Sequence, residues 1–275
     1  MAVVMRDLRN MHSYNTEQEA ARGLLVETTS VLVAQEVDYA IVGGWVPFLL
    51  NPGKYSHPGT YDVDILLNER TTKDQMAAAA ASLRERCFAR SPKNRFQLHR
   101  LLGVNGELVH FHLDFLHRKY ADDADGMFKR WGDLTSIAGP GTDIIFTESE
   151  RRQVDVSGVR PDGSATSVLI NFATEPGFLS AKGRSLHLPK RTRDAYDIFL
   201  VIAQSQDYGR LVSRCNELMA NKVFKLSMKA IVHEFGERDA YRNVAAWISE
   251  VSKEPPDVNE VEDTMVRFFE TIGAG

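Results

Sequence analysis

The chain has 275 residues, of which 43% are hydrophobic and 25% are charged, an ordinary composition for a globular protein of one large or two modest domains. The formal net charge of -4 excludes a general attraction to nucleic acid or anionic lipid, so any polyanion must be met by a local basic patch. No apolar run approaches the roughly 18 residues that span a bilayer, and the N-terminal segment turns polar too early for a signal peptide. Two cysteines, Cys87 and Cys215, lack metal-ligand spacing and fit a reducing compartment, so we expect a soluble, cytoplasmic protein with no membrane partner.

Patterns of helix and strand alternate in the first half of the chain. Apolar residues recur at helical spacing in some segments and form alternating or β-branched runs in others. Helices are predicted over residues 15–37 and 71–88, and strands over residues 39–45, 61–68 and 95–117. The dipeptide Asn105-Gly106 suits a tight turn, so the last segment is predicted to form a hairpin.

The second half of the chain is predicted to be mostly helical. The patterns weaken between about residue 121 and residue 163, and apolar side chains recur at helical spacing from Pro176 onward. We therefore predict an α/β domain, a mixed sheet with flanking helices, over residues 1–165. A mostly helical domain is predicted over residues 166–275.

The stretch YDVDILLN places two like charges in a strand that otherwise looks buried. Residues two apart in a strand point to the same side, so Asp62 and Asp64 point together while Val63 and Ile65 face the other way. Neighbouring carboxylates repel unless a cation or hydrogen-bond donors compensate them, and magnesium prefers such oxygen ligands. A magnesium site is predicted here, and the alternative is a solvent-exposed strand face with alternating polar residues.

A third carboxylate stands in another alternating strand, VHFHLDFL. Its polar face carries His110, His112 and Asp114, and Asp114 is predicted to join the aspartate pair from a neighbouring strand. Because magnesium prefers oxygen to imidazole, the two histidines are interpreted as polar residues on the wet face of the strand and not as ligands.

A pair of glycines, Gly43 and Gly44, ends the strand that precedes the aspartate pair. Glycine lets the backbone come close to a ligand, and it aims amide groups and a helix N-terminus at an anion such as phosphate. A plain tight turn is the alternative interpretation.

The order VGGW, YDVDIL and HLDF resembles the signature of the nucleotidyltransferase superfamily, which has the polymerase-beta-like fold. The resemblance implies that Asp62, Asp64 and Asp114 bind two magnesium ions that hold a nucleoside triphosphate (NTP). It also places Asp114 close to the attacking group, and Gly43 and Gly44 beside the nucleotide. The implied reaction is in-line attack on the α-phosphate, with pyrophosphate leaving. The seventeen residues between the glycines and the aspartates exceed the family's usual spacing.

The block SAKGRSLHLPKRTRDAYDIFLVI resembles the C-terminal motif of the AbiEii/AbiGii and MenT-like toxin group. The matching positions are Lys182, Arg193, Asp194, Tyr196 and Asp197. This resemblance implies that Lys182 contacts the triphosphate and that Asp194 helps to organise the site, which makes both nucleotide-binding residues. Charge pairing along a single helix is the alternative explanation.

The toxin resemblance implies a macromolecular acceptor, a tRNA or a protein, and a cognate antitoxin as a partner. Two basic clusters offer positive charge to an RNA: Arg84, Arg86, Arg90, Lys93, Arg95 and Arg100, and then Lys182, Arg184, Lys190, Arg191 and Arg193. The sequence GGW followed by HPGTYDVDIL is also similar to antibiotic nucleotidyltransferases of the aminoglycoside and lincosamide type, whose acceptor is a small drug. A nucleotide- or antitoxin-binding module without catalysis is the third alternative.

Overall fold

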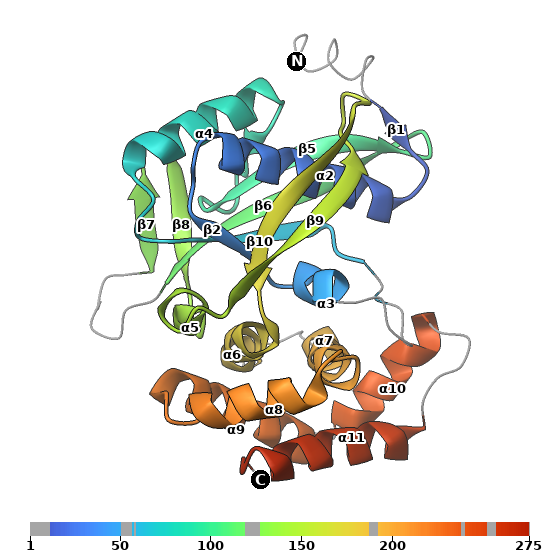
Figure 1. Ribbon diagram of the computed structural model, residues 1–275. Coiled ribbons are helices and arrows are strands. Elements are labelled where there is room, and N and C mark those ends of the chain that lie inside the picture. Colours follow the sequence, from blue (N-terminus) through green and yellow to red (C-terminus); the bar gives the residue numbers. More distant parts are fainter. Residues whose placement is uncertain are drawn as a thin grey trace. The chain divides into compact units, whose positions relative to one another are not determined.

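The computed structural model describes residues 12–50, 57, 59–118, 127–186, 192–237, 240–251 and 257–274. The chain forms two compact units, shown in Figure 1. The sheet unit comprises Met1–Val42, Gly59–Gly139 and Arg152–Phe172, and the helical unit comprises Gly43–Pro58, Pro140–Arg151 and Ala173–Gly275. Because the chain passes between the units several times, the predicted single boundary after residue 165 approximates only the last passage.

The sheet unit is built on one mixed β-sheet. Its strands are β1 (Ser13–Tyr14), β2 (Tyr39–Val42), β3 (Asp62–Leu67), β4 (Ala89–Arg90), β5 (Gln97–Val104), β6 (Glu107–Arg118), β7 (Phe128–Trp131), β8 (Leu134–Gly139), β9 (Arg151–Val159) and β10 (Ala165–Ala173). Their order is β1-β5-β6-β3-β2-β10-β9, with β4 beside β5, β8 beside β6, and β7 beside β8. β3 runs parallel to β6 and antiparallel to β2, while β5 and β6 form the predicted antiparallel hairpin. The predicted mixed α/β fold class is confirmed.

Two helices, α2 (Glu17–Ala34) and α4 (Lys73–Glu85), lie side by side on one face of this sheet (Figure 1). Each begins at a threonine. The Thr16 side chain accepts a hydrogen bond from the backbone amide three residues on, and Thr72 forms a capping box with Gln75. These caps satisfy amide groups that an uncapped helix leaves without partners, which fixes where both helices begin.

The strands present every second residue to this covered face. Val63 and Ile65 of β3 and Phe111, Leu113 and Phe115 of β6 are all fully buried. Burying each of these side chains stabilises the fold by about 1.5–3 kcal/mol relative to leaving it in water. The polar residues between them therefore point to the opposite face of the sheet.

One ion pair is buried between α2 and the sheet. The Arg100 guanidinium of β5 donates to the Glu27 carboxylate of α2, and the two residues are 6% and 4% exposed. Arg100 alternates in phase with Leu98 and Leu102, which are also buried. Burial raises the pKa of the Glu27 carboxyl to about 7, and the neighbouring Arg100 offsets part of this rise.

The raised pKa of the Glu27 carboxyl predicts that the stability of the protein depends on pH. Because its pKa in the folded protein lies above the ordinary 4.5, the folded state holds the proton more tightly than the unfolded state does. The resulting stabilisation is present below that ordinary pKa and is lost as the pH rises through about 7. Glu27→Gln is expected to flatten this loss, because the neutral amide stands in for the protonated carboxyl at every pH. Urea unfolding of both proteins across this pH range measures the effect, and parallel stability curves would contradict it.

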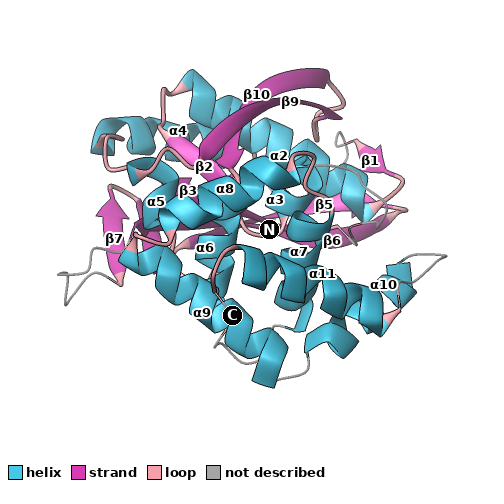
Figure 2. Cartoon of the chain, turned by 60° about the horizontal axis from the view of Figure 1, so that its bottom comes forward, coloured by secondary structure: helices cyan, strands magenta, loops and turns pink. Residues whose placement is uncertain are grey.

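The helical unit contains two short helices, α3 (Trp45–Leu50) and α5 (Asp143–Thr147), and a series of longer ones. The longer helices are α6 (Glu175–Ser185), α7 (Thr192–Ala203), α8 (Tyr208–Leu218), α9 (Lys222–Glu237), α10 (Ala240–Val251) and α11 (Val258–Thr271). α6 packs on α9, and α7 packs on α10 and α11 (Figure 2). A Cβ atom at Gly183 would collide with the backbone of Ser227, so this glycine permits the close approach of α6 and α9. Within the described residues, no helix is both long and apolar enough to cross a membrane.

Candidate active site

The three predicted aspartates lie on two neighbouring strands of the sheet unit. β3 and β6 run parallel with Asp64 opposite Asp114 and with Asp62 opposite His112. Adjacent strands are about 4.7–4.9 Å apart, and residues directly opposite one another point to the same face. The three carboxylates therefore share the sheet face that lies away from α2 and α4, and Asp114 joins the pair from a neighbouring strand as its alternating pattern predicts.

Side chains on the same face contact the carboxylates of Asp114 and Asp62. Gln97 Nε2 of β5 donates to Asp114 Oδ1 at 2.7 Å, and His112 Nδ1 lies 3.0 Å from Asp62 Oδ1. The side chains of Asp62 and His112 are 54% and 35% exposed. These contacts orient one oxygen of each carboxylate. The half-exposed side chain of Asp62 stays accessible to a dissolved ligand.

Two rows of polar residues cross strands β5, β6 and β3. In each row, the residues lie directly opposite one another on the paired strands. The rows are Gln97-Asp114-Asp64 and His99-His112-Asp62. We call these residues, together with the adjacent His110, the polar face. Burial lowers the pKa of the His99 imidazole, and the nearby His110 and His112 lower it further, which favours the neutral ring.

The strand pattern shows which face the histidines occupy, but it does not show which residues they contact across the sheet. His110 and His112 share the phase of Asp114, and that signal is visible in the sequence. His99 and Gln97 come from β5, and only the register of the hairpin brings them opposite His112 and Asp114. The contact of His112 with Asp62 likewise depends on the pairing of β3 with β6.

The donor chemistry of the polar face suits a hard divalent cation. Magnesium prefers oxygen ligands and usually takes one or two carboxylates, with substrate phosphates and water completing its octahedron. In the part of the chain that the structure describes, no three or more His, Cys, Asp or Glu side chains lie close enough to hold one metal ion. The three aspartates are therefore not gathered into a three-ligand cage.

The glycine pair follows β2 directly. The last residue of that strand, Val42, lies opposite Asp64. Gly43 has a φ of 69°, in the left-handed region that favours glycine, and its carbonyl accepts a hydrogen bond from the Val46 amide at 3.1 Å. This forms a tight turn into α3. Gly43 and Gly44 both belong to the helical unit, whereas the aspartates belong to the sheet unit.

Lys182 and Asp194 meet in a buried cluster of the helical unit. Lys182 Nζ of α6 donates to Asp194 Oδ1 of α7 at 2.6 Å and to Asp197 Oδ2 at 3.2 Å. The three residues are 8%, 5% and 2% exposed. The structure thus brings together the lysine and the Arg-Asp-X-Tyr-Asp helix of the sequence motif, and it places the ammonium group between two carboxylates. Any contact of Lys182 with phosphate has to compete with these ion pairs.

Two further residues complete this cluster. His57 Nε2 lies 3.4 Å from Asp197 Oδ1 and 3.1 Å from a terminal nitrogen of Arg193, whose Nε is 3.6 Å from the same carboxylate. Burial alone would raise the pKa of the Asp197 carboxyl, but Lys182, His57 and Arg193 together hold it below its ordinary value. His57 therefore contributes a contact to this cluster that the sequence motif does not reveal.

The first predicted basic cluster does not form one continuous surface. Arg100 is buried against Glu27, and Arg84 and Arg90 flank Asp133 at 3.2 Å and 3.6 Å. Arg95 instead lies over the Phe128 ring, with its guanidinium carbon 5.1 Å from the ring centroid. In the second cluster, Lys190 and Arg191 lie outside the described residues.

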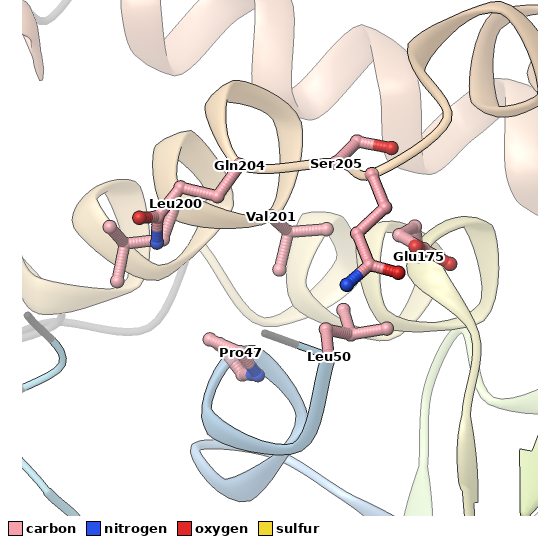
Figure 3. Close-up of a pocket in the computed structure, with 8 residues that line it drawn as sticks. Pro47, Leu50, Glu175, Leu200, Val201, Gln204 and Ser205 are labelled. Atoms are coloured by element: carbon pink, nitrogen blue, oxygen red, sulfur yellow. The ribbon is translucent and has the colours of Figure 1, made fainter. Parts of the chain in front are cut away.

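The helical unit encloses a cavity of about 10 Å³ between α3 and α7. Figure 3 shows Pro47 and Leu50 of α3 on one side and Leu200 and Val201 of α7 on the other, with Glu175 nearby. This volume is close to the minimum that one water molecule requires. It is too small for a nucleotide, whose sites usually measure roughly 300–1,000 Å³.

The sheet unit contains a larger cavity of about 320 Å³. Its lining includes Ala80 of α4 and Leu98 of β5, together with the charged residues Arg84, Arg90 and Asp133. Leu98 points to the face of the sheet that α2 and α4 cover, because it alternates with Gln97. The cavity is therefore on the opposite side of the sheet from the polar face and is not part of the candidate site.

Comparison with known proteins gives weak likenesses to solved structures. No protein-family model and no curated protein matches the chain. An antigenic nucleotidyltransferase-like protein from Paracoccidioides brasiliensis is 15% identical, with a TM-score of 0.42 over 78% of this chain and 95% of that one. JHP933 from Helicobacter pylori is 11% identical, with a TM-score of 0.42 over 91% of each chain. At these identities and TM-scores, the likeness assigns neither a reaction nor a residue role to this chain.

Proposed function

We propose that the chain is a nucleotidyltransferase that moves a nucleoside monophosphate from an NTP to an acceptor. One observation carries the proposal: Asp64 lies directly opposite Asp114, and Asp62 precedes Asp64 by two residues on the same face. Three carboxylates on one accessible sheet face repel each other in the free protein, and a cation with its polyphosphate would compensate them. Their order along the chain, after a strand that ends in two glycines, is the order that the superfamily resemblance implies.

The residues of the polar face have distinct parts in this proposal. Asp62, Asp64 and Asp114 would supply oxygen ligands to two magnesium ions, whose chemistry is to stabilise charge on the attacking and leaving oxygens. Gln97 would hold the Asp114 carboxylate in orientation, and His112 would do the same for Asp62, through the contacts described above. Gly43, Gly44, Lys182 and Asp194 remain proposed nucleotide-binding residues on the resemblance alone.

The acceptor is proposed to be a macromolecule, a tRNA or a protein, as in a toxin of a toxin-antitoxin or abortive-infection system. This step is supported by the Lys182, Arg193, Asp194, Tyr196 and Asp197 motif. All five positions are described, and four of them are buried, the exception being the half-buried Arg193. Four of the five positions that carry the resemblance meet in one cluster of ion pairs, namely Lys182, Arg193, Asp194 and Asp197.

The first test is transfer of label from an NTP to RNA. The purified chain is incubated with each α-labelled NTP, magnesium and total tRNA, beside Asp62→Ala and Asp64→Ala. We expect label on tRNA with the wild type and a loss of label in both variants, because each variant removes one of the proposed metal ligands. Asp155→Ala serves as the matched control, since Asp155 is an exposed aspartate on strand β9.

Each other outcome separates the alternatives. Pyrophosphate release without labelled tRNA would direct the search to protein acceptors and to small hydroxylated drugs, and raised drug resistance in cells would favour the antibiotic-modifying reading. Toxicity on expression that Asp64→Ala relieves would favour the toxin reading. NTP binding with no pyrophosphate release for any acceptor would reject the transferase in favour of a binding module.

A further inference from the structure

Three imidazole rings gather on the polar face beside the aspartates. His110 and His112 stand two residues apart on β6, and His99 of β5 lies opposite His112. The ring centroids of His110 and His112 are 6.5 Å apart and their planes differ by only 11°. His99 is tilted by 58° relative to His110, with 5.8 Å between the ring centroids. The first two rings are therefore parallel, and the third stands beside them.

The distance between the two parallel rings follows from the strand geometry, and it is close to twice the stacking distance of flat rings. Residues two apart on a strand are about 6.6 Å apart along its axis, which agrees with the separation of the two centroids. A flat ring placed midway between them would lie about 3.3 Å from each, close to the roughly 3.4 Å rise between stacked bases in a duplex. The centroid distance thus matches the spacing that a planar heteroaromatic group stacked between two rings requires.

We propose that His110 and His112 form a slot that holds one unpaired nucleobase by stacking. Nucleobases stack on aromatic side chains, histidine included, and such contacts tolerate any base because every base has a flat face. This inference rests on the proposed function. The contact between His112 and Asp62 places the slot beside the candidate metal ligands. The base belongs either to the incoming NTP or to an unpaired end of an RNA acceptor.

Position His110 tests the slot with least disturbance to the carboxylates. His110 is exposed and has no hydrogen bond to an aspartate among the described contacts, whereas His112 does. His110→Ala removes one wall of the slot, His110→Asn keeps a polar side chain without the ring, and His110→Phe keeps a flat ring without imidazole chemistry. His233→Ala is the matched control, because His233 is an exposed histidine on α9 of the helical unit.

Calorimetric titration measures binding of three probes in the presence of magnesium: an NTP, a short unstructured RNA, and inorganic tripolyphosphate, which has no base. We expect about tenfold weaker binding of the NTP or of the RNA by His110→Ala and His110→Asn, with His110→Phe and His233→Ala close to the wild type. Tripolyphosphate should bind all variants alike. A loss confined to the NTP assigns the slot to the donor base, and a loss confined to RNA assigns it to the acceptor.

Three results would overturn the slot. One is equal binding of both base-containing probes by wild type and His110→Ala. The others are an equal loss in His110→Phe and His110→Ala and a loss that extends to tripolyphosphate, since either would show that ring stacking is not what matters. Pyrophosphate release is recorded separately, so a protein that binds bases at the slot but never releases pyrophosphate refutes the proposed function and leaves the slot standing.

Discussion

Asp64→Asn is expected to lower the rate of pyrophosphate release by on the order of 10³-fold, which is the upper range for loss of one preorganised electrostatic partner. Asp64 is the central carboxylate of the polar face, since it lies opposite Asp114 and two residues from Asp62. Asparagine keeps the size and one oxygen of the side chain but removes the charge that a cation needs. Single-turnover release of pyrophosphate from each NTP, at saturating magnesium, measures the effect.

The same substitution is expected to leave the fold as stable as before, or more stable by up to about 1 kcal/mol. Like charges directly opposite each other on neighbouring strands are destabilising, and Asp64→Asn removes one such pair. Urea unfolding gives the free energy, and Asp155→Asn on β9 controls for removal of an exposed strand carboxylate. Loss of activity together with a large loss of stability would show that Asp64 has a structural role, contrary to the proposal.

The faces of the strands follow from sequence periodicity, and so does much of the sheet unit. Val63 and Ile65 alternate with Asp62 and Asp64, and burial follows that alternation. The hairpin turn at Asn105 is equally local, because Asn105 and the glycine after it have φ values of 51° and 84°, which a tight two-residue turn requires. Short-range rules suffice where the structural cause is within a few residues.

Long-range pairing accounts for what the sequence alone does not reveal. The contact of His112 with Asp62 depends on the pairing of β3 with β6, which α4, β4 and β5 separate along the chain. The placement of Gly43 in the helical unit depends on packing of its segment with residues more than a hundred positions away. Arg100 is an instructive case, since its phase with Leu98 indicates burial, yet counting basic residues along the chain groups it with exposed arginines.

Lys182→Met is expected to destabilise the protein by about 3–5 kcal/mol, the usual cost of removing one partner from a buried ion pair. Lys182 is the cation between Asp194 and Asp197, and methionine leaves both buried carboxylates without it. Because the pKa of Asp197 is held below its ordinary value, the cluster's stabilisation is present at neutral pH and is lost as the pH falls through that lowered pKa. Urea unfolding at neutral pH measures the loss.

Two comparisons separate this structural role from a role in binding phosphate. Arg184→Met on the same helix controls for removal of a half-buried basic residue, and it should cost far less. Adding Asp194→Asn and Asp197→Asn to Lys182→Met removes the uncompensated charges, so part of the stability should return. A Lys182→Met protein of unchanged stability but weaker tripolyphosphate binding would instead mean that the ammonium group serves the nucleotide and that Arg193 compensates Asp197 without it.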